Sequence, residues 1–273
     1  MRSYLEINRA YWDELANRHV ESAFYKTAAF RRGAVVLDPI VRERLGDAAH
    51  TRILHLQCHF GLDTLSLARM GARVTGLDFS GEAVRAARAL AREQGLDADF
   101  IECDVLKTPD DLSGFDIVFA SWGAICWIAD IGAWMRVAAR SVKAGGRLLL
   151  VEGHPFLMTL DERCKADAPF TVGWPYDSAE PLYQENQGDY ADPDGVLKAH
   201  SNVQFFHGVA KIVNAAIAAG FSIRALEELD RIPWQGLPQL VRADSDYWTL
   251  PPGAPFLPLA LVLDAVKDGR PCA

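Results

Sequence analysis

The chain has few of the features that would direct it to a membrane or to nucleic acid. Its 273 residues contain no apolar run near the roughly 20 residues that a transmembrane helix needs. Residues 1–6 lack the apolar centre of a signal peptide. Positive charge is in deficit, because 28 Lys and Arg stand against 36 Asp and Glu, a formal net charge of −8. Nucleic-acid binding needs a basic face, so we expect no nucleic-acid partner and no membrane partner, whereas a small-molecule substrate fits, a cationic one included.

The cysteines show no spacing typical of a metal or redox site. There are five, an odd number that cannot pair completely, and no two of them form a C-x-x-C pair. We therefore expect reduced thiols in a cytoplasmic protein, and no bound metal ion.

Four segments differ in their residue patterns. Residues 1–50 place apolar side chains at helical spacing, which predicts a helical lid segment with a second helix over 37–45. Residues 51–153 alternate short apolar strands with helices. Residues 154–208 are rich in proline and aromatic residues and are too long for an ordinary loop, which indicates an inserted cap. Residues 209–273 begin with a helix and finish the sheet, so all four segments form one domain overall.

The alternation predicts an α/β fold with a doubly wound, mostly parallel, seven-stranded sheet. We expect strands at 52–56, 73–77, 99–103, 116–120 and 147–152, and helices at 64–70, 82–93, 131–142 and 209–219. The last two strands, 222–229 and 259–266, are joined by a segment rich in Pro and Gly, which favours an antiparallel last strand.

Acidic side chains follow two neighbouring strands, where an open α/β sheet binds its ligand. Asp78 stands at the distance from the first turn at which an acid accepts hydrogen bonds from a ribose diol. Asp104 could accept from an adenine amino group, and Phe79 could lie against a purine. The structural alternative for Asp78 is a turn residue beside the helix cap Ser80.

The turn after the first strand argues against a dinucleotide. A pyrophosphate site needs a glycine-rich turn, and here only Gly61 is glycine, while Gln57 and His59 occupy the other glycine positions. A phosphate-binding G-x-x-x-x-G-K-[ST] loop is also missing from the sequence.

In their order along the chain, these features resemble the class I S-adenosylmethionine-dependent methyltransferases, in particular bacterial enzymes for small molecules. The resemblance rests on the first turn, on 75–80, on 102–105, on 115–120 and on the turn 143–147 before the fifth strand. It implies that S-adenosylmethionine is the cofactor and S-adenosylhomocysteine the product, with residues 51–153 as the cofactor-binding half. It implies these cofactor-binding residues: Gln57, His59, Gly61, Asp78, Phe79, Asp104, Val105, Ser121 and Trp122.

The first motif departs from the family pattern. The family has an acid at the position of His55 and glycines at those of Gln57 and His59. His59 and Asp63 are the two candidates to supply polar contacts to the amino-acid end of the cofactor. His55 is either a ligand or a hydrogen-bonded strand residue.

Methyl transfer is an in-line displacement, which depends mainly on positioning and needs a base only when the acceptor is protonated. We expect the base among His154, His207 and Tyr11. For each histidine the alternative is a capping or core role. Aromatic residues predicted to contact substrate are Tyr4, Trp127, Trp174, Tyr176 and Tyr183.

Acids and aromatics in the cap favour N-methylation of a small amine. O-methylation of a phenol or carboxylate and a non-catalytic nucleoside-binding or interaction role stay open as alternatives. Aromatic residues on the first helix fit either a lid or a contact in a homo-oligomer.

Overall fold

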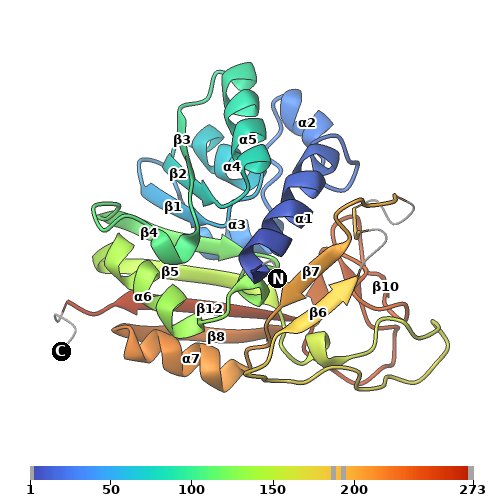
Figure 1. The fold of residues 1–273 in the computed structure, drawn as a ribbon. Helices are drawn as coiled ribbons and strands as arrows, with labels where there is room; N and C mark the ends of the chain where they lie inside the picture. The colour runs from blue at the N-terminus through green and yellow to red at the C-terminus, as the bar shows by residue number, and fades with distance from the viewer. Residues whose placement is uncertain (1–2, 186–188, 192–194, 270–273) are drawn as a thin grey trace.

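A seven-stranded mixed sheet forms the centre of the computed structural model, which describes residues 3–185, 189–191 and 195–269. The strand order is β3-β2-β1-β4-β5-β12-β8, and β12 runs antiparallel to both of its neighbours while the other six strands are parallel (Figure 1). The bounds are β1 Arg52–Leu56, β2 Arg73–Asp78, β3 Ala98–Glu102, β4 Phe115–Ser121, β5 Val142–Gly153, β8 Phe221–Leu229 and β12 Ala260–Lys267. The predicted fold class and the antiparallel last strand are confirmed.

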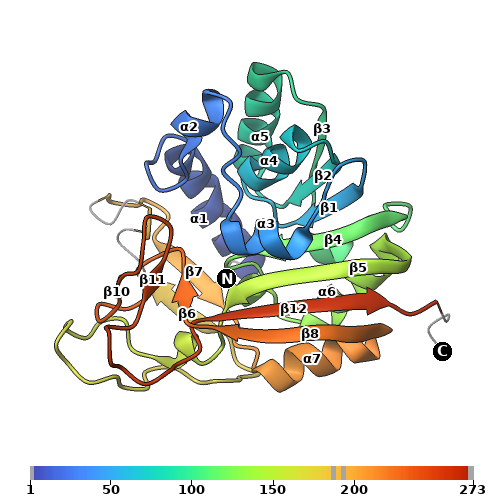
Figure 2. The ribbon, with the colours of Figure 1, turned by 180° about the vertical axis from the view of Figure 1, so that it is seen from behind.

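Helices cover both faces of the sheet because the strands are apolar on both sides. Leu54 and Leu56 of β1 face the core cluster that contains α6 and α7, whereas Ile53 faces the one that contains α3 and α4. Figures 1 and 2 show α6 and α7 on one face and α3 on the other. The bounds are α3 Pro39–Leu45, α4 Leu62–Arg69, α5 Gly81–Gln94, α6 Ile131–Ser141 and α7 Val209–Ala218.

Local signals explain most helix ends. Ser80 accepts from the backbone N–H of Ala83 and begins α5, and Gly95, with φ of 61°, ends it. The predicted turn 143–146 lies within β5 as an irregularity, because Phe115 pairs with Val142 but Ile117 pairs with Arg147. One short helix, α2 at Thr27–Arg31, was not predicted.

The remaining elements gather where the parallel strands end. They are α1 Tyr4–His19, the pair β6 Leu182–Glu185 and β7 Ser201–Gln204, and the small sheet of β9 Arg231–Ile232, β10 Val241–Arg242 and β11 Trp248–Thr249. Short 3-10 turns lie at η1 Val105–Lys107, η2 Ile125–Trp127 and η3 Leu157–Thr159. Figures 1 and 2 show β6, β7 and β10 beside the carboxyl ends of β5 and β8. The covering layer therefore includes residues 230–249 as well as the cap expected at 154–208.

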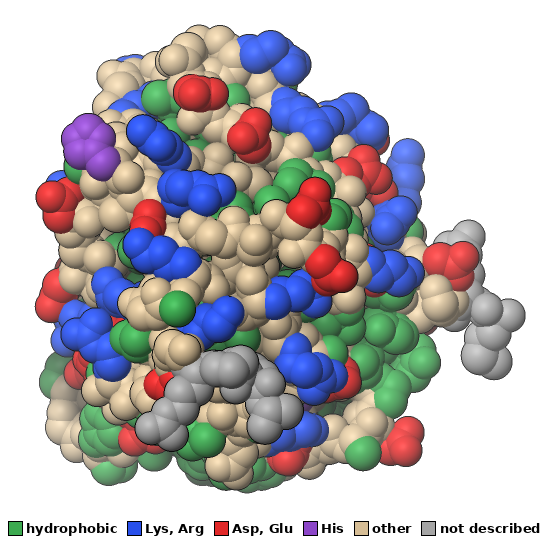
Figure 3. All heavy atoms as spheres, turned by 90° about the vertical axis from the view of Figure 1, so that its left-hand side faces the viewer, with side chains coloured by type: hydrophobic (Ala, Val, Ile, Leu, Met, Phe, Trp, Pro, Cys, Tyr) green, Lys and Arg blue, Asp and Glu red, His purple; other side chains and the backbone are tan. Residues whose placement is uncertain are grey.

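The surface at the amino ends of the parallel strands carries both positive and negative side chains. Figure 3 looks onto this face, where Lys and Arg side chains are abundant and acids lie between them. Among the described residues, no helix combines the length and the apolar character that a membrane span requires.

Candidate active site

Three left-handed residues shape the loop between β1 and α4. Gln57, His59 and Gly61 have φ angles of 56°, 53° and 73°. Such angles suit glycine and cost a larger residue about 1–2 kcal/mol. A Cβ at Gly61 would also lie 2.5 Å from a carbon of the Phe100 ring, so glycine is required there by packing as well. The chain thus keeps the backbone of a glycine-rich turn with larger side chains at two of its positions.

Hydrogen bonds hold this loop in place. The amide nitrogen of Gln57 donates to the carbonyl of Ala124 at 2.7 Å, and its oxygen accepts from the indole N–H of Trp134 at 2.8 Å. The backbone N–H of His59 donates to Asp78 at 2.8 Å. These contacts offset the cost of the left-handed angles.

Asp78 ends β2 and joins two loops. Its second carboxylate oxygen accepts from the backbone N–H of Ser80 at 2.9 Å. Burial raises the pKa of Asp78 to about 6, although hydrogen bonds from the backbone N–H groups of Ser80, His59 and Phe79 lower it. A carboxylate has about four acceptor positions, so Asp78 can still accept from a ligand. The turn role considered as the alternative is therefore compatible with a binding role.

The residues after β3 cap the next turn. The carboxylate of Asp104 accepts from the backbone N–H of Leu106 at 3.0 Å, and Val105 is buried. Phe79, after β2, is half-buried. Burial and the nearby charge of Asp104 raise the pKa of Tyr4, which places the start of α1 near the end of β3.

Helix α1 covers this edge through side-chain hydrogen bonds. The Asp13 carboxylate accepts from the hydroxyl of Ser80 at 2.6 Å. The Asn8 amide exchanges two hydrogen bonds with the backbone of Val203 in β7, at 2.7 and 2.8 Å. The Glu14 carboxylate accepts from the backbone N–H groups of 198 and 199. Helix α1 therefore links the cap to the helix that follows β2.

A chain of polar rings lies beside the β1–α4 loop, and of these rings His19 is fully buried. The Nδ1 atom of His19 lies 2.9 Å from Nε2 of His59, and Nε2 of His19 lies 3.0 Å from the Asp189 carboxylate. The hydroxyls of Tyr25 and Tyr190 are hydrogen-bonded beside them. Burial lowers the pKa of His59 well below its usual range, so its ring is neutral at pH 7.

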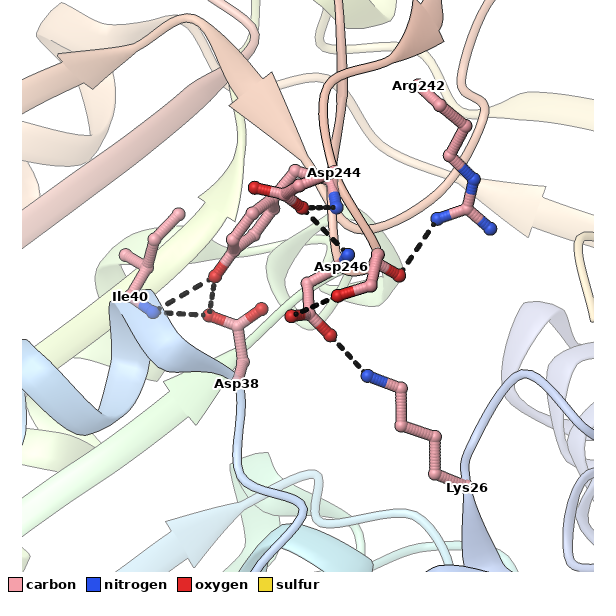
Figure 4. Close-up of polar contacts among 8 residues, drawn as sticks. Lys26, Asp38, Ile40, Arg242, Asp244 and Asp246 are labelled. Atoms are coloured by element: carbon pink, nitrogen blue, oxygen red, sulfur yellow. Dashed lines mark hydrogen bonds and ion pairs between the residues drawn. The ribbon is translucent and has the colours of Figure 1, made fainter.

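Two acids lie at the centre of the edge, in α4 and before α3. The Asp63 carboxylate accepts from the hydroxyl of Ser121, at the end of β4, over a long 3.4 Å. Burial, with the charge of Asp38 added, raises the pKa of Asp63 to about 7. Asp38 itself accepts from the hydroxyl of Tyr247 at 3.0 Å and from the backbone N–H of Ile40 at 2.9 Å (Figure 4).

Glu152, at the end of β5, organises the loop after β4. Its buried carboxylate accepts from the backbone N–H groups of Gly123, Ala124 and Ile125. Trp122 in the same loop is left-handed, with φ of 48°, and its indole packs edge-on against Trp234 at 5.8 Å between ring centroids.

A cavity opens beside this loop, between the ends of β4 and β5 and the cap. Its empty space amounts to about 570 Å³, part of which is open solvent. The side chains that line it include Cys126, Glu152, Tyr176, Phe206, His207 and Trp234. Its wall is therefore mainly apolar and aromatic, with a small number of polar groups, as expected of a small-molecule site.

The two candidate histidines differ in their partners. Nε2 of His207 lies 2.7 Å from the carbonyl of Ile128, and a carbonyl can only accept, so Nε2 carries the proton. The other nitrogen, Nδ1, is then an unprotonated acceptor, and it is buried with no partner among the described residues. His154 uses both nitrogens, with Phe156 and Glu228, and does not line the cavity.

The predicted aromatic residues are divided between the site and the surface. Tyr176 lines the cavity. Trp127 packs against Tyr11, and its buried indole N–H has no partner among the described residues. Trp174 instead donates to Glu162 on the cap surface. Tyr183, on β6, is 66% exposed.

Several residues of the site were not predicted. Trp234 comes from a segment without helical or strand periodicity, and the hydrogen-bonded pair Tyr25 and Tyr190 lies 165 residues apart in the sequence. The only signal for His19 is its position on the buried face of α1. His55 is confirmed as a hydrogen-bonded strand residue, because Nδ1 lies 2.8 Å from the Thr64 hydroxyl.

Comparison with known proteins agrees with the fold. Residues 53–146 match the family model described as "Methyltransferase domain". The chain is 27% identical to "Methyltransferase phqN" of Penicillium fellutanum over 191 residues, 67% of this chain and 51% of that protein. It is 30% identical to a "Ubiquinone biosynthesis O-methyltransferase" of Pectobacterium atrosepticum over 125 residues, 46% of this chain and 49% of that protein. The chain thus spans about half the length of these curated relatives.

A solved structure shares the fold over most of the chain. It is described as an S-adenosylmethionine dependent methyltransferase from Mesorhizobium loti, with a TM-score of 0.57 and 23% identity, covering 87% of this chain and 100% of that one. The resemblance to class I methyltransferases drawn from the sequence is therefore confirmed at the level of domain and fold.

Proposed function

We propose that this chain, which carries a methyltransferase domain on the class I fold, transfers a methyl group from S-adenosylmethionine to a small molecule and releases S-adenosylhomocysteine. The observation that carries the proposal lies at the carboxyl ends of β1 and β2. There Asp78 accepts from the backbone of a left-handed loop in which Gln57 and His59 take conformations that suit glycine. The names of the matched family, relatives and structure support it.

The residues present fit this cofactor. Asp78 retains acceptor positions for the ribose hydroxyls, and the half-buried Phe79 and the Asp104–Val105 turn lie at the neighbouring strand ends for adenine. The buried indole N–H of Trp127 lacks a partner in the described residues, as expected of a donor that serves a ligand. When bound, S-adenosylmethionine supplies a methyl carbon activated by its sulfonium.

The protein's own part is to orient the acceptor and remove its proton. The cavity beside Glu152 is our substrate site, since it lies at the ends of β4 and β5, next to the cofactor edge. The aromatic side chains of Tyr176 and Trp234 exclude water there. We assign Nδ1 of His207 as the base, because it is the unprotonated nitrogen and has no other partner in the described part of the chain.

The charge of the cavity favours an amine as the acceptor. Glu152 has no cationic partner among the described residues, and aromatic rings surround it. An anionic carboxylate substrate would be repelled, whereas an ammonium is attracted by the carboxylate and by the ring faces. We therefore propose N-methylation of a small amine.

O-methylation of a phenol is the second candidate. It is favoured by the names of relatives such as the Pectobacterium ubiquinone biosynthesis O-methyltransferase. A phenol is neutral and aromatic, so it suits the same wall, and His207 would accept its proton in the same way.

The test is methyl transfer from radiolabelled S-adenosylmethionine to matched amines and phenols of equal ring size. Transfer to amines supports the proposal, and transfer to phenols alone replaces it with the second candidate. Cofactor binding without transfer to either class would leave a nucleoside-binding role.

A further inference from the structure

We propose that Asp63 binds the α-ammonium group of the methionine part of S-adenosylmethionine. This inference rests on the proposed function and deepens it, since it identifies how the chain holds the amino-acid end of the cofactor although two loop glycines are replaced by Gln57 and His59. The carboxylate would act as a charged acceptor for a cation, a stronger hydrogen bond than one between neutral groups.

The order of the strands gives the position. In the spatial strand order β3-β2-β1-β4, the acceptors proposed for adenosine, Asp104 and Asp78, follow β3 and β2. The rest of an extended ligand must therefore cross β1 towards β4 and the cavity. Asp63, in the first turn of α4, reaches Ser121 at the end of β4 and so lies on this path.

The electrostatic surroundings of Asp63 lack a counter-charge. Among the described residues no Lys, Arg or His forms an ion pair with it, and its single side-chain partner is the Ser121 hydroxyl at 3.4 Å. The charge that acts on it is that of another acid, Asp38, whose own carboxylate accepts from Tyr247 and Ile40. A partly buried carboxylate without a cationic partner is costly, and a cationic ligand group removes that cost.

The other polar groups of the loop are already engaged. Both ends of the Gln57 amide are hydrogen-bonded within the protein. The backbone N–H of His59 is held by Asp78, and its Nε2 by His19. Of the two candidates for the missing polar contacts, Asp63 is therefore the one whose charged group remains available.

The experiment compares two ligands that differ in the amino-acid part. S-adenosylhomocysteine carries the ammonium, and 5′-methylthioadenosine keeps the adenosine and the sulfur without it. In Asp63→Asn we expect calorimetry to show about a tenfold to hundredfold loss of affinity for S-adenosylhomocysteine, and less than about a twofold change for 5′-methylthioadenosine. Asp116→Asn, at the opposite end of β4 beside Arg52 and Lys143, is the matched control and should leave both affinities unchanged.

Each outcome separates this inference from the proposed function. If the parent chain binds both ligands and Asp63→Asn weakens neither, or weakens both equally, the inference is wrong and the proposed function stands. If the parent chain binds neither ligand, both are wrong. A melting curve checks the fold of Asp63→Asn, and Asp63→Ser provides a second uncharged variant with the same expected selectivity.

Discussion

The backbone N–H of His59 donates to the carboxylate of Asp78 at 2.8 Å, which joins the loop after β1 to the end of β2. This contact places a left-handed histidine where the family pattern has glycine. The turn keeps left-handed backbone angles without glycine at these positions, because hydrogen bonds from other elements stabilise them. A change in the first motif therefore alters the side chains around the ligand and preserves the path of the chain.

Replacing Asp78 should weaken the adenosine end of the site. Asp78→Ala removes the proposed ribose acceptor and leaves the N–H groups of His59 and Ser80 without their partner. We expect about a tenfold or greater loss of affinity for both S-adenosylhomocysteine and 5′-methylthioadenosine, measured by calorimetry. The equal loss distinguishes Asp78 from Asp63. Unchanged affinity for either ligand would contradict the ribose assignment.

Restoring a glycine at position 57 should destabilise the protein. Gln57→Gly relieves about 1–2 kcal/mol of left-handed strain. It also removes the partners of the Trp134 indole and the Ala124 carbonyl, at about 1–3 kcal/mol for each group that stays unsatisfied. The loss is larger than the gain, so the midpoint of urea unfolding should fall. A variant more stable than the parent chain would show that strain dominates.

His207 should control turnover and leave cofactor affinity unchanged. His207→Ala removes the free Nδ1, and we expect turnover to fall about a hundredfold while the affinity for S-adenosylhomocysteine stays the same. Burial lowers the pKa of His207, so turnover of the parent enzyme should fall only below the ordinary histidine range. His154→Ala is the comparison, and a larger effect there would transfer the role of base to His154.

Stability without ligand should decrease as pH rises, partly because of Asp63. Its pKa is raised to about 7 in the folded chain, so the folded state binds more protons than the unfolded state between about pH 4 and 7. This contribution is complete below the unfolded pKa and is lost as pH rises through 7. The groups that face Asp63 are Asp38, Ser121 and Tyr25.

The same variant tests this pH dependence. The stability of Asp63→Asn relative to the parent chain should grow from pH 5 to pH 8 in urea unfolding, because the amide carries no charge at any pH. A difference that is constant with pH would place the raised pKa on another group, such as Asp78 or Glu152, whose pKa values burial also raises.

The sheet could be predicted from the sequence because its information is local. Short apolar runs such as Ile53 and Leu54, and terminating glycines such as Gly95, mark strands and helix ends within a few residues. The left-handed turn at Gln57 also follows from its place in the motif, although the hydrogen bonds that stabilise it come from Ala124 and Trp134, far along the chain.

The site was less predictable because its partners are distant in sequence. His19 meets Asp189 across 170 residues, and no periodicity signals such a contact. The sequence does not separate the roles of His154 and His207. Only the fold shows that the first uses both nitrogens and that Nδ1 of the second has no partner among the described residues. Trp234 lines the cavity from a segment expected only to connect the last strands.

Calorimetric titration of the whole chain with S-adenosylmethionine and S-adenosylhomocysteine, with NAD as the control ligand, tests the central claim most directly. We predict one site of about micromolar affinity for the first two ligands and no binding of NAD, because the β1–α4 loop carries Gln57 and His59 where a pyrophosphate needs glycines. Failure of both methyl-donor ligands to bind, or preferential binding of NAD, would contradict the account.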